Sequence, residues 1–181
     1  MIDKINKIKE ITNLYSEKKF HQAIDEAKKF IKKSDDWSIR NIHSASLMAL
    51  NQDNEAIESY KEAIIIYPDI PDLYNNLGAV YKKIGENKLA LKNYEKAIKL
   101  KNDYKDAKLN VANVYQEIGE IQKAIIIYEK LIQNNNNDYV SLYNLGVAYL
   151  NINENDKALK IFQESNKIFP TPHTQNNIGL I

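Results

Sequence analysis

Four asparagines recur along the sequence at almost constant intervals. They are Asn76, Asn110, Asn144 and Asn177, which are separated by 34, 34 and 33 residues. An amide side chain carries N–H donors and a carbonyl acceptor, which complement the C=O and N–H groups of a peptide backbone whatever its side chains are. One such hydrogen bond contributes only about 0.5–1.5 kcal/mol net, so a binding surface needs several. Because asparagine is abundant in this chain, local bonding within the protein is an equally valid interpretation.

The other reactive residue types do not form a catalytic or metal-binding set. The chain has no cysteine and only five scattered glycines, which excludes thiol chemistry and leaves no glycine-rich phosphate loop. Its three histidines, His21, His43 and His173, lack the spacing of metal ligands. We therefore expect no catalytic residue, no cofactor and no metal site, and we interpret His43 as a hydrogen-bonded packing residue. The protein is expected not to be an enzyme.

The charges are nearly balanced, with 25 Lys and Arg against 24 Asp and Glu. A net charge of +1 gives no field that favours nucleic acid or a membrane surface, and we expect neither as a partner. The N-terminal residues alternate lysine and isoleucine without the apolar core of a signal peptide. No run approaches the roughly 20 apolar residues that span a bilayer. A cytoplasmic location is the default expectation.

The asparagines belong to a repeat of about 34 residues. Residues 71–104 carry Tyr74, Gly78, Ala90 and Tyr94, and similar residue types return one period earlier and later. A fixed period of this size indicates a solenoid, in which each repeat buries its apolar face against its neighbours. Apolar residues at helical spacing predict two helices and a turn per repeat. The expected repeats are 4–36, which is divergent, 37–70, 71–104, 105–138, 139–171 and a partial repeat at 172–181.

This order of aromatic, Leu-Gly, Tyr, Ala, aromatic and Ala positions resembles the tetratricopeptide repeat (TPR) family. The resemblance implies an all-α fold, a right-handed α-solenoid of stacked helix–turn–helix units, as one array over residues 1–181. Small residues are expected where the two helices of a repeat cross. The aromatic stripes, interpreted as core, are Tyr60, Tyr94, Tyr128 and Phe162, with Tyr81, Tyr115 and Tyr149. Four residues that close the first helices are also expected to be structural: Leu50, Ile84, Ile118 and Ile152.

In this family the first helix of each repeat lines a concave groove. The asparagine series falls on a lining position and is similar to the ladder in the O-linked N-acetylglucosamine transferase superhelix, where amides hold an extended peptide. Ile42 interrupts the series, so we expect any binding surface in the C-terminal part. The other candidate peptide-binding residues are Asn113, Lys82, Tyr143, Val147 and Leu150. The last three predict an apolar seat for a ligand side chain, unless curvature or a further repeat covers them.

Two functions remain open at this stage. The first is a non-catalytic scaffold that binds a protein or an extended peptide. The second is the N-terminal substrate-recruiting arm of a larger enzyme, such as a glycosyltransferase or sulfotransferase, because similar arrays are often fused to such domains. The carboxylate clamp that binds chaperone C-terminal tails is absent, since Asp106 or Val140 stands where lysine is required.

The C-terminal segment leads to one further expectation. Residues 172–181 match only part of a first helix, which suggests that the chain is a fragment of a longer protein. Solenoids normally need a polar terminal cap. We therefore expect Ile178, Leu180 and Ile181 to be exposed and a homodimer to form through this end.

Overall fold

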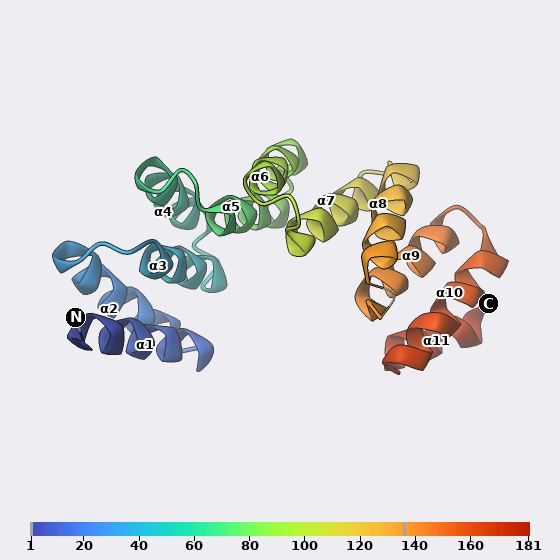
Figure 1. The fold of residues 1–181 in the computed structure, drawn as a ribbon, viewed down its shortest axis with the longest axis horizontal. Coiled ribbons are helices and arrows are strands. Elements are labelled where there is room, and N and C mark those ends of the chain that lie inside the picture. Colours follow the sequence, from blue (N-terminus) through green and yellow to red (C-terminus); the bar gives the residue numbers. More distant parts are fainter. Residues whose placement is uncertain (1, 136) are drawn as a thin grey trace. The chain divides into compact units, whose positions relative to one another are not determined.

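The computed structural model describes residues 2–135 and 137–181, and these residues form eleven α-helices and no β-strand. Successive helices pair as two antiparallel helices joined by a tight turn (Figure 1). The helices are α1 (Ile2–Ser16), α2 (Phe20–Lys33), α3 (Trp37–Ala49), α4 (Asp53–Ile66), α5 (Pro71–Lys83), α6 (Asn87–Leu100), α7 (Lys105–Glu117), α8 (Ile121–Asn134), α9 (Tyr139–Asn151), α10 (Asn155–Ile168) and α11 (Pro172–Leu180). The odd-numbered helices are the first helices of the expected repeats.

The chain divides into two compact modules, an N-terminal module (Met1–Asn102) and a C-terminal module (Asp103–Ile181). In the N-terminal module each helix packs on the next, and α3 also contacts α1 and α5. In the C-terminal module α7 packs on α8, α8 on α9, α9 on α10 and α10 on α11, and α7 also contacts α9. First helices of neighbouring repeats therefore lie side by side within each module.

The turn inside each repeat requires a left-handed backbone conformation. Glycine adopts it without steric cost at Gly85 and Gly119, where φ is 82° and 83°. Asparagine tolerates this conformation better than most residues and occupies the same turn at Asn51 and Asn153. The first repeat uses Lys18, with φ of 60°. The turn geometry is thus kept in all five helix pairs although only two have glycine.

Side-chain caps and prolines mark where several helices begin. Asp36 accepts a hydrogen bond from the Ser38 N–H at 3.1 Å, as expected for the N-cap of α3. Thr171 caps α11 in the same way, with the Thr174 N–H donating at 3.1 Å. Pro71 and Pro172 stand in the first turns of α5 and α11, where a missing N–H costs nothing.

The main aromatic stripe forms the core, as predicted. Tyr60, Tyr94, Tyr128 and Phe162 are at most 1% exposed. The small residues beside them are required by the same packing. A Cβ on Gly146 would lie 2.7 Å from the Phe162 ring, so a larger residue would displace this ring. Gly78 has the same relation to Tyr94, also at 2.7 Å.

Three of the four residues that close the first helices are more exposed than predicted, whereas Leu50 packs against the core. Ile84, Ile118 and Ile152 are 42%, 44% and 38% exposed, because each is the C-cap of its helix, where the chain leaves the interface between the helices. The second aromatic stripe, Tyr81, Tyr115 and Tyr149, is partly buried and packs against the core, as predicted. Tyr115 and Tyr149 lie at the rim, with the ammonium groups of Lys123 and Lys157 5.3 and 5.6 Å from their ring centres.

The expectation for the C-terminal helix is met only in part. Leu180 is 75% exposed and Ile181 41% exposed. Ile178 is half-buried, contrary to the prediction, because α11 packs on α10 and shields one of its faces. Association of two copies through this helix stays a prediction.

Candidate functional site

The predicted asparagines of the C-terminal module lie on three first helices, Asn110 on α7, Asn144 on α9 and Asn177 on α11. All three are half-buried. The Asn144 Nδ2 donates a hydrogen bond to the Asn113 Oδ1 at 3.3 Å, which links α9 to α7. The same oxygen accepts a hydrogen bond from the Tyr128 hydroxyl at 2.7 Å. Asn113 therefore joins three helices, and the contact between two predicted site residues lies within the protein.

The fourth asparagine, Asn76, lies on α5 in the N-terminal module. Its Nδ2 donates to the Asn41 Oδ1 on α3 at 2.8 Å, and its Oδ1 accepts from the Asn75 Nδ2 at 3.2 Å. Local bonding thus accounts for part of the amide chemistry of Asn76 and Asn144. Each amide has more donor and acceptor positions than these contacts use, so a ligand can bond to the same side chains.

An apolar pocket of about 160 Å³ is lined on α9 by Val140, which lies one helical turn before Asn144. It is lined by Tyr139, Val140, Tyr143, Thr171, His173 and Thr174, which come from α9, α11 and the N-cap of α11. Of the predicted apolar residues, Tyr143 lines this pocket. Val147 and Leu150 are half-buried on α9 but do not belong to the lining.

The walls of this pocket are held by contacts with the core. The ring of Tyr143 lies 5.7 Å from that of Phe162, and the ring of Tyr139 lies 4.8 Å from that of Phe169. The Ser165 hydroxyl donates to the Tyr139 carbonyl at 2.9 Å. Such a pocket is largely preformed, which reduces the entropic cost of binding.

The contributions of α11 to the pocket were missed in the sequence. His173 occupies the same groove-lining repeat position as Val140, but Thr171 and Thr174 do not fall on the lining positions that the resemblance implies. The available signal was Thr171 followed by Pro172, because a threonine before a proline indicates the start of a helix that must pack against its predecessor. Thr174 is 1% exposed and its hydroxyl bonds to Thr171 at 2.7 Å, which fixes this end of α11.

Lys82, the lysine predicted to bind peptide, does not belong to the C-terminal module. Lys82 is half-buried in the last turn of α5, in the N-terminal module. Its neighbour Lys83 donates to the Met48 carbonyl, the Asn51 Oδ1 and the Asp53 Oδ1 at 2.7–3.0 Å. Lys83 is therefore a structural link between two repeats.

His43 is a hydrogen-bonded packing residue, as expected. The Ser44 hydroxyl donates to the Arg40 carbonyl at 2.9 Å, so the Ser59 hydroxyl donates to Ser44 at 2.7 Å and accepts from His43 Nδ1 at 2.8 Å. Burial, with smaller contributions from Lys28 and Arg40, lowers the pKa of His43 to about 4. The imidazole is neutral at physiological pH.

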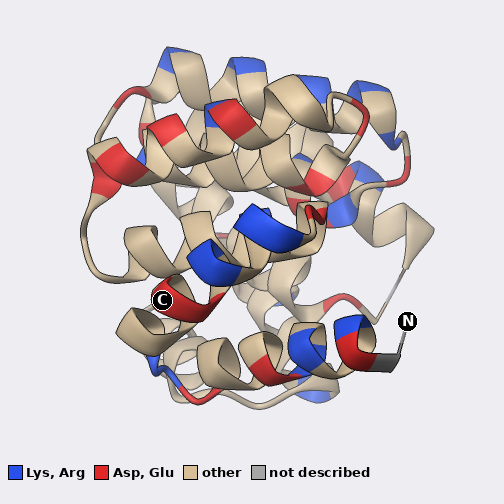
Figure 2. Ribbon diagram, turned by 90° about the vertical axis from the view of Figure 1, so that its left-hand side faces the viewer, with Lys and Arg blue, Asp and Glu red and all other residues tan. Residues whose placement is uncertain are grey.

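The charged groups are distributed over the surface. In the view of Figure 2, Lys and Arg segments alternate with Asp and Glu segments along the helices that face the viewer. Within residues 2–135 and 137–181, no three His, Asp or Glu side chains are arranged to hold a metal ion. None of the helices described there has the length and apolar character that crossing a membrane requires.

Stacked helix–turn–helix units with buried small and aromatic residues define a TPR solenoid. Family models agree with this class, one described as TPR repeat and three as tetratricopeptide repeat. They match residues 46–85, 71–104, 106–138 and 127–160. The chain belongs to the tetratricopeptide repeat family.

Solved structures with the same fold are TPR proteins. A crystal structure of MamA protein is 26% identical, with 91% of each chain covered and a TM-score of 0.74. TTC0263, a thermophilic TPR protein in Thermus thermophilus, is 18% identical over 98% of this chain and 97% of its own, with a TM-score of 0.77. YrrB, described as a TPR protein with an unusual peptide-binding site, is 20% identical over 97% of this chain and 91% of its own, with a TM-score of 0.73. No curated protein matches the sequence.

Proposed function

We propose that the protein is a non-catalytic scaffold that binds an extended protein or peptide segment. The binding surface is the first-helix face, which we define as the surface of the C-terminal module formed by α7, α9 and α11. The observation that carries this proposal is the apolar pocket between α9 and α11. Its lining residue Val140 lies one helical turn before Asn144, whose amide is linked to that of Asn113.

The amides suit the backbone of an extended peptide, and the pocket suits one of its side chains. Amide side chains can bond to its backbone N–H and C=O groups without regard to sequence. The pocket can take one apolar side chain, because 160 Å³ is too small for more than one large residue. Recognition through main-chain bonds plus a side-chain pocket is a common way to bind extended peptides. The peptide-binding site described for YrrB supports the same class of ligand.

Val140 provides a direct test of the pocket. The change Val140→Asp places a carboxylate in the first turn of α9, where a negative charge is compatible with the helix dipole. The fold should therefore be kept, while burying a carboxylate against an apolar ligand side chain is unfavourable. We expect peptides selected on the wild-type chain from a random display library to bind the variant at least tenfold more weakly. Fluorescence anisotropy measures this change.

The matched control is Asn151→Asp, which adds the same charge at an exposed position of the same helix. This variant should bind the selected peptides with the same affinity as the wild-type chain. Equal binding by wild type and Val140→Asp would show that peptides are not held at this pocket.

The second function considered, a recruiting arm of a larger enzyme, is not favoured by any observation in the described residues. Their charged and polar groups supply capping, ion pairs between repeats and core hydrogen bonds. We assign no catalytic role to them.

A further inference from the structure

In the C-terminal module, two hydrogen-bond donors converge on one carbonyl oxygen. The Tyr128 hydroxyl on α8 and the Asn144 amide on α9 both donate to the Asn113 Oδ1 on α7, at 2.7 and 3.3 Å. Tyr128 is fully buried, and its hydroxyl also contacts the Gln116 Oε1 at 3.2 Å. The side-chain carbonyl of Asn113 thus satisfies a buried phenol and an amide of the next repeat.

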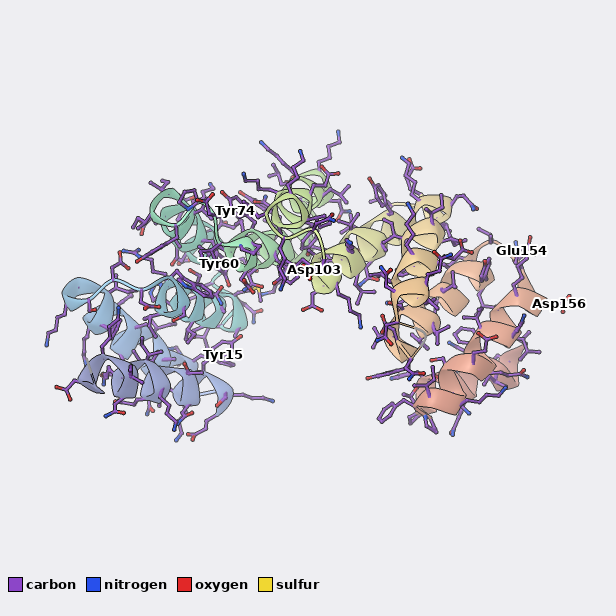
Figure 3. All side chains as sticks on the ribbon, viewed as in Figure 1. Tyr15, Tyr60, Tyr74, Asp103, Glu154 and Asp156 are labelled. Atoms are coloured by element: carbon purple, nitrogen blue, oxygen red, sulfur yellow. The ribbon has the colours of Figure 1, made fainter. Side chains whose placement is uncertain are left out.

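The N-terminal module has the same arrangement without the acceptor. Two repeat periods earlier, Tyr60 on α4 and Asn76 on α5 occupy the positions of the two donors. Ala45 on α3 occupies the position of Asn113. Figure 3 shows Tyr60 inside this module, among α3, α4 and α5. Ala45 is buried and has no side-chain acceptor.

Both donors show the effect of the missing carbonyl. The Tyr60 side chain is fully buried, and its hydroxyl has no hydrogen-bond partner among the described residues. The Asn76 amide lies near enough to influence this hydroxyl, but its Nδ2 donates to Asn41 instead. Burial raises the pKa of Tyr60 and Tyr15 adds a smaller increase, which together outweigh the lowering by the nearby Asn76 amide. The phenol therefore keeps its proton and remains a donor. Buried donors without a partner are rare in folded proteins.

We propose that a carbonyl oxygen of a bound peptide segment takes the place in the N-terminal module that Asn113 Oδ1 has in the C-terminal module. It enters over Ala45, where the side chain is small, and accepts hydrogen bonds from the Tyr60 hydroxyl and from the Asn76 amide after this amide turns away from Asn41. This inference rests on the proposed function and adds the Tyr60 hydroxyl to the contacts expected from the asparagine series. It also gives Asn76 a role as a ligand donor.

Two substitutions test the proposal on the full chain. Ala45→Asn supplies the missing acceptor from within the protein, so we expect a higher melting temperature and at least tenfold weaker binding of a peptide selected on the wild-type chain. Tyr60→Phe removes a hydroxyl that bonds to nothing among the described residues, so the melting temperature should be unchanged or higher. Its peptide affinity should fall roughly 3- to 10-fold, the effect of one hydrogen bond.

Tyr128→Phe is the matched control, because it removes a hydroxyl with two partners inside the protein. It should lower the melting temperature, whereas Tyr60→Phe should not. If Tyr60→Phe and Ala45→Asn bind the selected peptide as wild type does, while Val140→Asp does not, the carbonyl site is wrong and the proposed function stands. If the display selects no peptide, the proposed function fails and the carbonyl site with it. If Val140→Asp binds normally while Tyr60→Phe and Ala45→Asn bind more weakly, the pocket of the C-terminal module is wrong and the carbonyl site stands.

Discussion

Truncation of the central aromatic residue of the C-terminal module, Phe162→Ala, should lower the free energy of unfolding by about 3–5 kcal/mol. The Phe162 side chain is fully buried, at 0% exposure. Its ring fills the space that the missing Cβ of Gly146 leaves, and it supports Tyr143 in the pocket wall. Urea denaturation followed by circular dichroism measures the change.

Phe169→Ala is the control, because Phe169 is 53% exposed and its ring packs against that of Tyr139. Its loss should cost no more than about 1 kcal/mol. If the two alanine variants were equally stable, the assignment of the aromatic stripe to the core would be wrong. Since neighbouring repeats stabilise one another, we also expect Phe162→Ala to weaken peptide binding by loosening Tyr143.

The second large effect is expected at Asp138, whose side chain is 2% exposed. Its carboxylate caps α9 by accepting from the Ser141 N–H and hydroxyl at 3.4 and 2.5 Å, and it pairs with the Lys105 ammonium of α7 at 3.0 Å. Asp138→Ala removes the cap and the link between two repeats, with an expected cost of about 2 kcal/mol. Thermal and urea unfolding at neutral pH measure this cost.

The effect of Asp138 depends on pH in a defined direction. Burial alone raises the pKa of this carboxyl, but the hydrogen bonds from Ser141 and Lys105 outweigh it, and the net pKa is below its ordinary value. A carboxyl with a lowered folded-state pKa stabilises the fold above its unfolded pKa, and this stabilisation is lost as pH falls through the folded pKa. The difference in free energy of unfolding between wild type and Asp138→Ala should therefore have its full value at pH 7 and shrink below about pH 4. A difference that stays constant down to about pH 2 would contradict the role of the ionised carboxylate.

The period and the residue types at fixed positions were sufficient to predict the helices and the main core. The same repeat position is buried in four repeats, because the two helices of each repeat cross in the same way. Its residues are Tyr60, Tyr94, Tyr128 and Phe162. Exposure at the helix ends was not predictable in this way. Ile84 is apolar and periodic, yet its side chain leaves the core, since the direction of a C-cap side chain depends on backbone geometry that the hydrophobic pattern does not record.

The candidate site was harder to predict because its contacts join different repeats. Asn76 and Asn144 occupy the same repeat position, but they bond to Asn41 and Asn113 respectively. This difference follows from two exchanges on the preceding first helix, where Ala45 corresponds to Asn113 and Asn41 corresponds to Leu109. The pocket likewise needs both α9 and α11, so a search restricted to one helix finds only half of its wall.

The most direct test of the central claim is a methyl NMR titration of the full chain with a peptide selected by display. Binding at the first-helix face should shift the methyl signals of Val140 and Val147 on α9, with little change at Ile126, which is 45% exposed on the second helix α8. Saturating shifts at Val140 and Val147 would support the proposed function. Shifts centred on Ile126, with Val140 unaffected, would contradict it and place the binding surface on the second helices.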